Sequence, residues 1–311
     1  MREQLTWVEP EMEQVLKAAG LRQYGDYVAC KLGKVVGQSG TTLTKRIRLA
    51  TSSGHGVYFL KVYRYSGRGW RHRSAVGPWR RHDKGFTEAR NYRILREHCG
   101  LLVPDVVCHG CRRRWYGVVD AFILTRGVPG AIPLDELAAN RWPDAHKAFE
   151  DPARRHLLRS TARIVSRMHA AGFYHVDLQW RNLLVANDER PHPAVYVIDS
   201  TRGGLRRCGI YRAHGQLRDL SSLCKQARVS MTRTEQLRWL RDYLGAEASR
   251  RNDMTECAAW PAARLAVWRI DRLRYSCATP EKPVTKCSST VRAMIRTILL
   301  DRSIKDNDVS A

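Results

Sequence analysis

The most constraining feature of the sequence is a polar stretch, residues 174–182, that leads into two short apolar runs. The first run is Leu183–Val185, and the second, Val195–Ile198, stops at Asp199. Runs of this length and composition predict β-strands, and two strands so close in the chain favour a hairpin. If they pair, the last residue of the polar stretch and Asp199 lie at adjacent ends of that hairpin.

The polar residues around this hairpin are those that phosphoryl transfer requires. The amide oxygen of Asn182 and the carboxylate of Asp199 could together hold Mg²⁺, which prefers hard oxygen ligands and shares them with substrate phosphates. Asp177, on the loop before the hairpin, could then accept a proton from a substrate hydroxyl. The competing interpretation is a chance His-x-Asp in a surface loop together with a buried carboxylate at a strand end.

The same residues resemble the catalytic loop of protein-kinase-like enzymes, in which a His-x-Asp-Leu-x-x-x-Asn pattern is followed by a metal-binding Asp. The residues at the offsets of this pattern are His175, Asp177, Leu178 and Asn182. Within that superfamily, the stretch is most similar to bacterial lipopolysaccharide kinases, which phosphorylate heptose or Kdo sugars of the inner core.

The resemblance implies an α+β fold of the protein-kinase-like type, with a small antiparallel β-rich N-lobe, a larger helical C-lobe, and ATP and Mg²⁺ between them. It implies that Asn182 and Asp199 hold the metal, that Asp177 orients and deprotonates the acceptor, and that His175 braces the loop. Arg181 could face the transferring phosphate. The sequence departs from the Asp-Phe-Gly of protein kinases after Asp199, so an activation switch driven by Phe is not supported.

A lysine and a glutamate upstream complete the predicted nucleotide site. Lys61 lies inside the β-prone run 57–63, where a bare ammonium is costly unless it is paired. It could extend from an edge strand into solvent, or it could be the strand lysine with which kinase-like folds bind nucleotide phosphates. Glu88 shares a helical face with Tyr92 and Leu95, which is unusual for a solvated carboxylate. The sequence therefore predicts a Lys61–Glu88 ion pair.

Two glycines before this strand could also serve the nucleotide. Gly37 and Gly40 separate two strand-like runs and match the glycine-rich loop of kinases loosely. Their backbone amides could cover phosphates. An ordinary tight turn fits the same residues equally well.

Together with the resemblance, the order of patterns along the chain implies three regions: a helical extension over 1–30, a kinase-like N-lobe over 31–126 and a kinase-like C-lobe over 127–311. Within the first, apolar residues at helical spacing from Met12 to Ala19 favour a helix that caps the lobe over one that lies on a membrane.

Strands are predicted at 115–119 and 121–125, and the clearest helix at 152–171. A helix over 217–225 is expected to place Asp219 against the catalytic-loop backbone. A Thr232–Glu235 capping box predicts another helix that ends at Gly245. Later helices are expected around 265–273 and 291–299.

The chain carries a net charge of +24, which comes mainly from arginine. Such a field attracts nucleic acid, anionic lipid headgroups or a phosphorylated glycolipid, although solvated arginines would give the same count. Residues 64–84 interleave arginine with tryptophan and could grip phosphates and sugars, or they could be a solvated insertion. The pair Cys108 and Cys111 lacks a second pair at zinc-site spacing.

The favoured location is the cytoplasm, with peripheral contact at the cytoplasmic face of the inner membrane as an option. No run approaches the roughly 20 apolar residues of a membrane span, the first residues lack the apolar core of a signal peptide, and nine cysteines without an export signal favour reduced thiols.

The expected function is ATP- and Mg²⁺-dependent transfer of a phosphoryl group to a hydroxyl, favouring a lipopolysaccharide core sugar or a similar anionic glycolipid. The alternatives are a protein or small-molecule kinase, or a catalytically silent kinase-like protein that binds RNA or a membrane through its arginines. The sequence indicates no oligomeric state.

Overall fold

The structure is a computed structural model that describes residues 2–52, 54–65, 83–114, 117–186 and 193–251. All of the described residues lie in one compact unit of the chain. Most of the basic stretch 64–84 and the helices expected around 265–273 and 291–299 lie outside the described residues.

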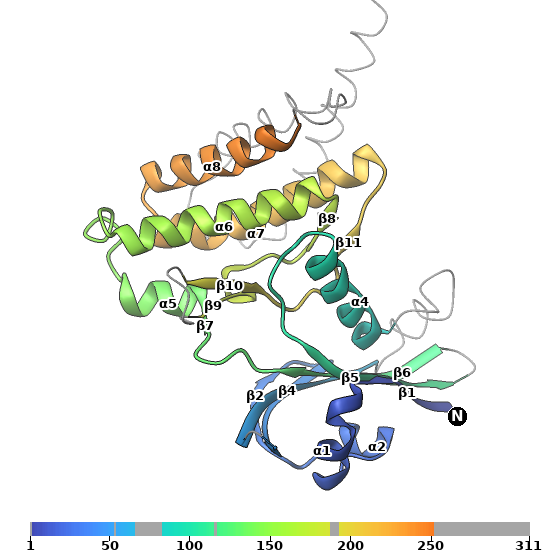
Figure 1. Cartoon of the computed structure of the whole chain (residues 1–311). Coiled ribbons are helices and arrows are strands. Elements are labelled where there is room, and N and C mark those ends of the chain that lie inside the picture. Colours follow the sequence, from blue (N-terminus) through green and yellow to red (C-terminus); the bar gives the residue numbers. More distant parts are fainter. Residues whose placement is uncertain (1, 53, 66–82, 115–116, 187–192, 252–311) are drawn as a thin grey trace, which may run out of the picture. The chain divides into compact units, whose positions relative to one another are not determined.

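A six-stranded antiparallel sheet forms the N-terminal part, in the order β1-β5-β6-β4-β3-β2 (Figure 1). Its strands are β1 (Arg2–Val8), β2 (Lys34–Gln38), β3 (Thr42–Thr51), β4 (Gly54–Arg64), β5 (Val106–Arg114) and β6 (Gly117–Arg126). Because successive side chains of a strand point to opposite faces, Leu60 and Val62 of β4 share one face of the sheet. Lys61 and Tyr63 lie on the other, so the same strand builds both the core and the candidate site.

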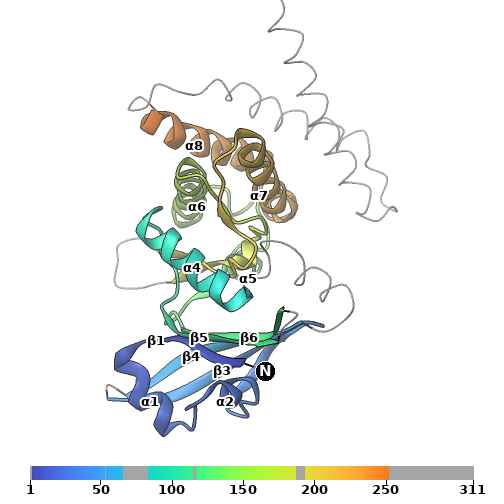
Figure 2. The ribbon, with the colours of Figure 1, turned by 90° about the vertical axis from the view of Figure 1, so that its right-hand side faces the viewer.

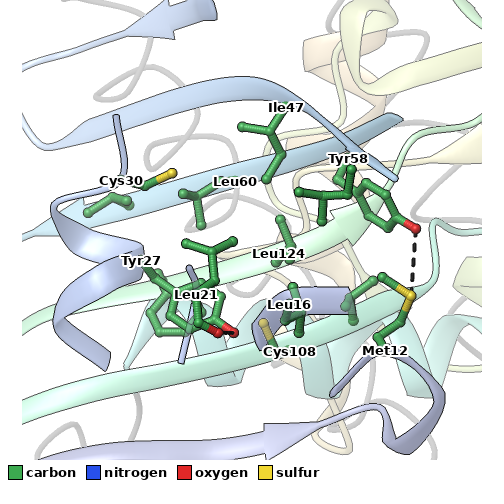
Figure 3. Packing of buried hydrophobic residues seen from close by; sticks show 14 of the residues in the cluster. Met12, Leu16, Leu21, Tyr27, Cys30, Ile47, Tyr58, Leu60, Cys108 and Leu124 are labelled. Atoms are coloured by element: carbon green, nitrogen blue, oxygen red, sulfur yellow. Dashed lines mark hydrogen bonds between the residues drawn. The ribbon is translucent and has the colours of Figure 1, made fainter. Parts of the chain in front are cut away.

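Two short helices, α1 (Glu13–Ala18) and α2 (Tyr24–Val28), cover the first face of this sheet (Figure 3). Leu16 packs there among the buried residues of β3, β4 and β6, and Tyr27 stacks on Phe122 with ring centroids 4.3 Å apart. The predicted helix that caps the lobe is therefore confirmed.

The prediction of a wholly helical extension over 1–30 is wrong for residues 2–8, which form the edge strand β1 paired with β5. A register shift between Leu5 and Trp7 interrupts the alternation of side chains, and this bulge hides the strand in the sequence pattern.

Residues 117–126 form the single strand β6, so the prediction of two short strands around Asp120 is wrong. Asp120 is only 4% exposed, and it accepts hydrogen bonds from Arg112 on β5 and from the hydroxyl of Tyr24 on α2. An aspartate inside an apolar run resembles a turn signal, but here its charge is paired within the ladder.

The C-terminal part is helical (Figure 1). Its helices are α5 (Leu134–Arg141), α6 (Pro152–Ala170), α7 (Gly209–Ser230) and α8 (Arg233–Arg251). Short strands accompany them: β7 (Ile132–Pro133), β9 (Leu183–Ala186) and β10 (Ala194–Val197) in one sheet, and β8 (Phe173–Tyr174) with β11 (Gly204–Leu205) in another. The predicted α+β class, with a β-rich N-terminal part and a helical C-terminal part, is confirmed.

Two predicted helices can be compared in detail. The helix predicted over 152–171 is α6, and Asp151 caps its start by accepting from the backbone of Ala153 at 2.8 Å. The capping box of α8 is confirmed by hydrogen bonds of 2.8 and 3.2 Å between Thr232 and Glu235. The predicted end at Gly245 is wrong, because α8 continues to Arg251; one glycine costs a helix only about 1 kcal/mol.

Helix α4 (Lys84–Glu97) lies between the sheet and the helices α6 and α7, as Figures 1 and 2 show. No helix of the described residues is long and apolar enough to cross a membrane. β6 ends at Arg126, close to the predicted lobe boundary, and the boundaries at 30 and 126 remain predictions.

The close approach of α4 to the sheet gives a first prediction. A Cβ added at Gly85 would collide with the backbone carbonyl of Phe122 on β6. We expect Gly85→Ala to push the helix from the sheet and to lower the free energy of unfolding by about 1–3 kcal/mol, measured by urea denaturation. Gly25→Ala in α2, where an added Cβ meets nothing within 4 Å, is the control and should be neutral or slightly stabilising. Equal stabilities for the two variants would contradict the prediction.

Candidate active site

The predicted ion pair between Lys61 and Glu88 is confirmed, with 2.8 Å between Lys61 Nζ and Glu88 Oε1. Glu88 is fully buried on α4, and two further donors reach its carboxylate: the Tyr92 hydroxyl at 2.6 Å and the Tyr63 hydroxyl. Burial and the charge of Glu88 raise the pKa of both tyrosines well above the usual value, so that both remain donors. Three donors around one buried carboxylate offset the cost of removing it from water.

Lys61 also reaches Asp199, with 3.4 Å between Nζ and Oδ1. Burial alone would lower the pKa of Lys61, but the carboxylates of Glu88 and Asp199 raise it above its usual value. Burial alone would likewise raise the pKa of Asp199, whereas the positive charge of Lys61 holds it below its usual range. Both groups are therefore charged at neutral pH, and they join β4 to the end of the β9–β10 hairpin.

The predicted hairpin is confirmed, and it brings Asn182 and Asp199 together. Leu183 pairs with Val197, and the backbone amide of Ile198 donates to the carbonyl of Asn182 at 3.0 Å. Asn182 ends a turn of 3-10 helix, residues 180–182, and its Nδ2 donates to the Asp177 carbonyl at 2.8 Å. Since Nδ2 holds the loop, Oδ1 is the atom of Asn182 that could bind a metal.

The loop from His175 to Asp177 is held by Asp219 of α7, as predicted. The Asp219 carboxylate accepts from the backbone amides of His175 at 2.8 Å and Val176 at 2.6 Å. Val176 has φ 70°, a conformation that is strained for a β-branched residue. The two hydrogen bonds keep this peptide in place and so fix the backbone that carries Asp177.

His175 braces the loop against the hairpin, which was also predicted. It is fully buried, and its Nε2 donates to the carbonyl of Ile198, the residue before Asp199, at 2.9 Å. Asp177 itself is half-buried, and Gln179 Nε2 donates to its Oδ1 at 2.8 Å. One oxygen of the proposed base is thereby oriented by the chain itself.

Helix α4 also positions the segment after Asp199. The Tyr92 hydroxyl accepts from the Asp199 amide at 3.0 Å, and Asn91 Nδ2 donates to the carbonyls of Ser200 and Gly203 at 2.6 and 3.0 Å. Asp199 has φ 59°, so its backbone is held in the left-handed region. The sequence argument missed these roles; the available signal was that Asn91 and Tyr92 lie three and four residues after Glu88, on the same helical face.

His169 of α6 links the carboxylate of Asp219 to α8. Its Nε2 lies 3.2 Å from Asp219 Oδ2, and its Nδ1 lies 3.0 Å from the Tyr243 hydroxyl of α8. Gln216 donates to that hydroxyl, so the hydroxyl can donate to Nδ1 and leave the proton on Nε2 for Asp219. Helices α6, α7 and α8 therefore all support the carboxylate that holds the catalytic loop.

The remaining residues predicted for the site are Arg181, Gly37 and Gly40. Arg181 is exposed, and its charge contributes, after burial, Lys61 and His175, to the pKa of Asp199. Gly37 lies on β2 and Gly40 in the turn to β3, so the two strand-like runs are confirmed as paired strands, while the contact of these glycines with phosphates stays a prediction.

Cys108 and Cys111 are both buried on β5, but they belong to core clusters on opposite faces of the sheet. One zinc ion could not reach both thiols in this arrangement.

The second prediction compares Tyr63 and Tyr92, whose hydroxyls both donate to Glu88. Tyr92→Phe and Tyr63→Phe each remove one donor to Glu88 and should each cost about 1–3 kcal/mol in the free energy of unfolding. Only Tyr92→Phe also releases the Asp199 amide, so it should lower kcat by about tenfold or more, while Tyr63→Phe stays near the parent activity. Equal kcat for the two variants would show that Tyr92 does not position Asp199.

Comparisons with known proteins bear on the fold and on the family of the chain. A search of curated protein sequences found no match. Among solved structures, one described as WaaP in complex with acyl carrier protein matches with a TM-score of 0.55 and 22% sequence identity, covering 86% of this chain and 99% of that chain. The likeness shows a shared fold.

The family model of the lipopolysaccharide kinase (Kdo/WaaP) family matches residues 33–243, well over half of the chain. Members of this family are kinases that act on sugar hydroxyls. The resemblance noted in the sequence is therefore confirmed, and the chain is a phosphotransferase that belongs to the lipopolysaccharide kinase (Kdo/WaaP) family.

Proposed function

We propose that the chain transfers the γ-phosphoryl group of ATP to a hydroxyl of a lipopolysaccharide core sugar, heptose or Kdo, or of a similar glycolipid, in a reaction that depends on Mg²⁺. The observation that carries the proposal is the convergence of Lys61, Asp199 and the Asn182–Asp177 loop, which come from distant parts of the chain. Family membership supports the sugar as the class of acceptor.

The residues present fit a nucleotide bound with Mg²⁺. The Asp199 side chain is 45% exposed, its pKa lies below the usual range, and it is therefore an ionised oxygen ligand open to the site. Together with the amide oxygen of Asn182 it offers the hard oxygen atoms that Mg²⁺ prefers, with substrate phosphates as further ligands. When bound, the metal neutralises negative charge on the phosphates.

The chain itself supplies positioning and one proton acceptor. Lys61, fixed by Glu88, would bind phosphate oxygens with a charge that is already oriented before the nucleotide arrives. Asp177 would accept the proton of the acceptor hydroxyl, with Gln179 holding one of its oxygens. Catalysis of this type is mostly positioning and charge stabilisation. The loop that carries Asp177 suits it, because Asp219 fixes its start and Asn182 fixes its end by hydrogen bonds.

The acceptor is proposed from the family and from charge. A net charge of +24 attracts an anionic glycolipid, which a lipopolysaccharide core presents. The similar solved structure is described as WaaP in complex with acyl carrier protein. For this chain we propose the glycolipid as the acceptor that it binds. A location at the cytoplasmic face of the inner membrane follows from that acceptor and is part of the proposal.

The third prediction tests the two aspartates. We expect Asp177→Asn to lower kcat by about 10²–10⁴-fold, the contribution of a general base, while the shift in melting temperature caused by ATP with Mg²⁺ is retained. Asp199→Asn should lose both turnover and the Mg²⁺-dependent part of that shift. Glu97→Gln, an exposed position on α4, is the control for a lost carboxylate. Unchanged turnover in either aspartate variant would refute the assignment.

The fourth prediction concerns the acceptor. When the protein is incubated with labelled ATP and the separated lipid, protein and RNA fractions of its own cells, we expect the label in the lipopolysaccharide of the lipid fraction. Label in the protein fraction would instead identify a protein kinase. Binding of RNA that weakens steeply with salt, without any effect of nucleotide on the melting temperature, would indicate a silent binding protein.

A further inference from the structure

An apolar and basic surface lies where β11 leads into α7. Leu205, Ile210 and Tyr211 are 47%, 55% and 61% exposed. Single exposed apolar side chains are ordinary, but three within seven residues make this segment a candidate interaction site. We call this segment, residues 205–211, the β11–α7 surface.

Arginine is frequent in the sequence on both sides of these apolar residues. Residues 200–218 contain five arginines and no aspartate or glutamate: Arg202, Arg206, Arg207, Arg212 and Arg218. The first turn of α7 holds no acidic residue, and its N-cap Cys208 makes no side-chain hydrogen bond to the helix, so the positive end of the helix dipole adds to the same field. A partner that is apolar in part and negatively charged would complement this segment.

The β11–α7 surface is joined to the catalytic loop through a short ladder. Strands β11 and β8 are neighbours (Figure 1), with Leu205 paired to Phe173 and Gly204 to Tyr174. The residues that follow Tyr174 form the loop that carries Asp177. Four extended residues span at most about 14 Å, and the spacing between paired strands adds about 5 Å. The backbone of Asp177 therefore lies within about 20 Å of Leu205, a distance that a few sugar units attached to a lipid can bridge.

We propose that the β11–α7 surface inserts into the interface of a membrane that contains anionic lipids, and so presents the active site to an acceptor sugar on a lipid. The inference deepens the proposed function and rests on it for the nature of the acceptor. Tyrosine and arginine suit the interface, because an aromatic ring with a polar tip sits at headgroup level while arginine stems lie along apolar surface with their charge in the headgroups. The side chains of Leu205 and Ile210 would enter the acyl boundary.

The test is cosedimentation of the full chain with lipid vesicles, without nucleotide. We expect binding to vesicles of phosphatidylcholine with phosphatidylglycerol, and much weaker binding to phosphatidylcholine alone. The double variant Ile210→Ser with Tyr211→Ser should reduce partitioning at least tenfold, and Arg207→Gln about fivefold. The matched controls lie at the other end of the same helix: Val229→Ser, where the side chain is 81% exposed, and Arg228→Gln should bind like the parent.

Three outcomes would overturn the proposal. These are equal partitioning of the Ile210–Tyr211 variant and the parent, no binding to anionic vesicles, and equal loss in the Val229→Ser control. An acidic protein that binds the parent but not the double variant, in the absence of vesicle binding, would identify a protein interface instead.

Vesicle binding is also independent of the kinase assignment. Asp177→Asn should bind vesicles like the parent, so a failure of the proposed function and a failure of this inference give different results. If both hold, the Ile210–Tyr211 variant should phosphorylate a delipidated core sugar normally and lose activity only toward the acceptor embedded in vesicles.

Discussion

The arrangement of this site depends on one buried charge, the carboxylate of Glu88. A buried carboxylate is tolerated only when it is paired and hydrogen-bonded, and its donors, Lys61, Tyr63 and Tyr92, come from β4 and from α4 itself. Two of the three make a second contact, Lys61 to the side chain and Tyr92 to the backbone of Asp199. The requirement to satisfy Glu88 therefore also sets the position of the aspartate that the proposed metal needs.

A second constraint acts on the catalytic loop. Val176 and Asp199 are the two non-glycine residues with positive φ among the described part of the chain, and both lie at the site. Such conformations persist only where the surroundings impose them. Asp219 holds the first, and Tyr92 with Asn91 holds the second. The site is thus assembled before any ligand binds, which is the condition for catalysis by positioning.

The sequence predicted the parts of the site whose signals are local. The hairpin from Asn182 to Asp199 follows from two apolar runs, and the Lys61–Glu88 pair from two charges that stand out in apolar surroundings. Errors arose where a partner distant in the sequence decides the structure. Asp120 interrupts an apolar run, yet the distant Tyr24 on α2, together with Arg112 on the neighbouring strand, lets the strand continue. Asn91 looked like an ordinary polar helix residue, because its partners lie about a hundred residues away.

The contacts of the segment after Asp199 explain how it is held without the Phe of the Asp-Phe-Gly pattern. In its place stands Ser200, which is fully buried and whose carbonyl is held by Asn91. The segment is then fixed again a few residues later, where β11 pairs with β8. A chain held at both points has little freedom to swing as a switch. The same rigidity ties the start of α7 to Asp177, so a membrane contact at the β11–α7 surface would set the height of the active site above the lipid rather than merely keep the enzyme nearby.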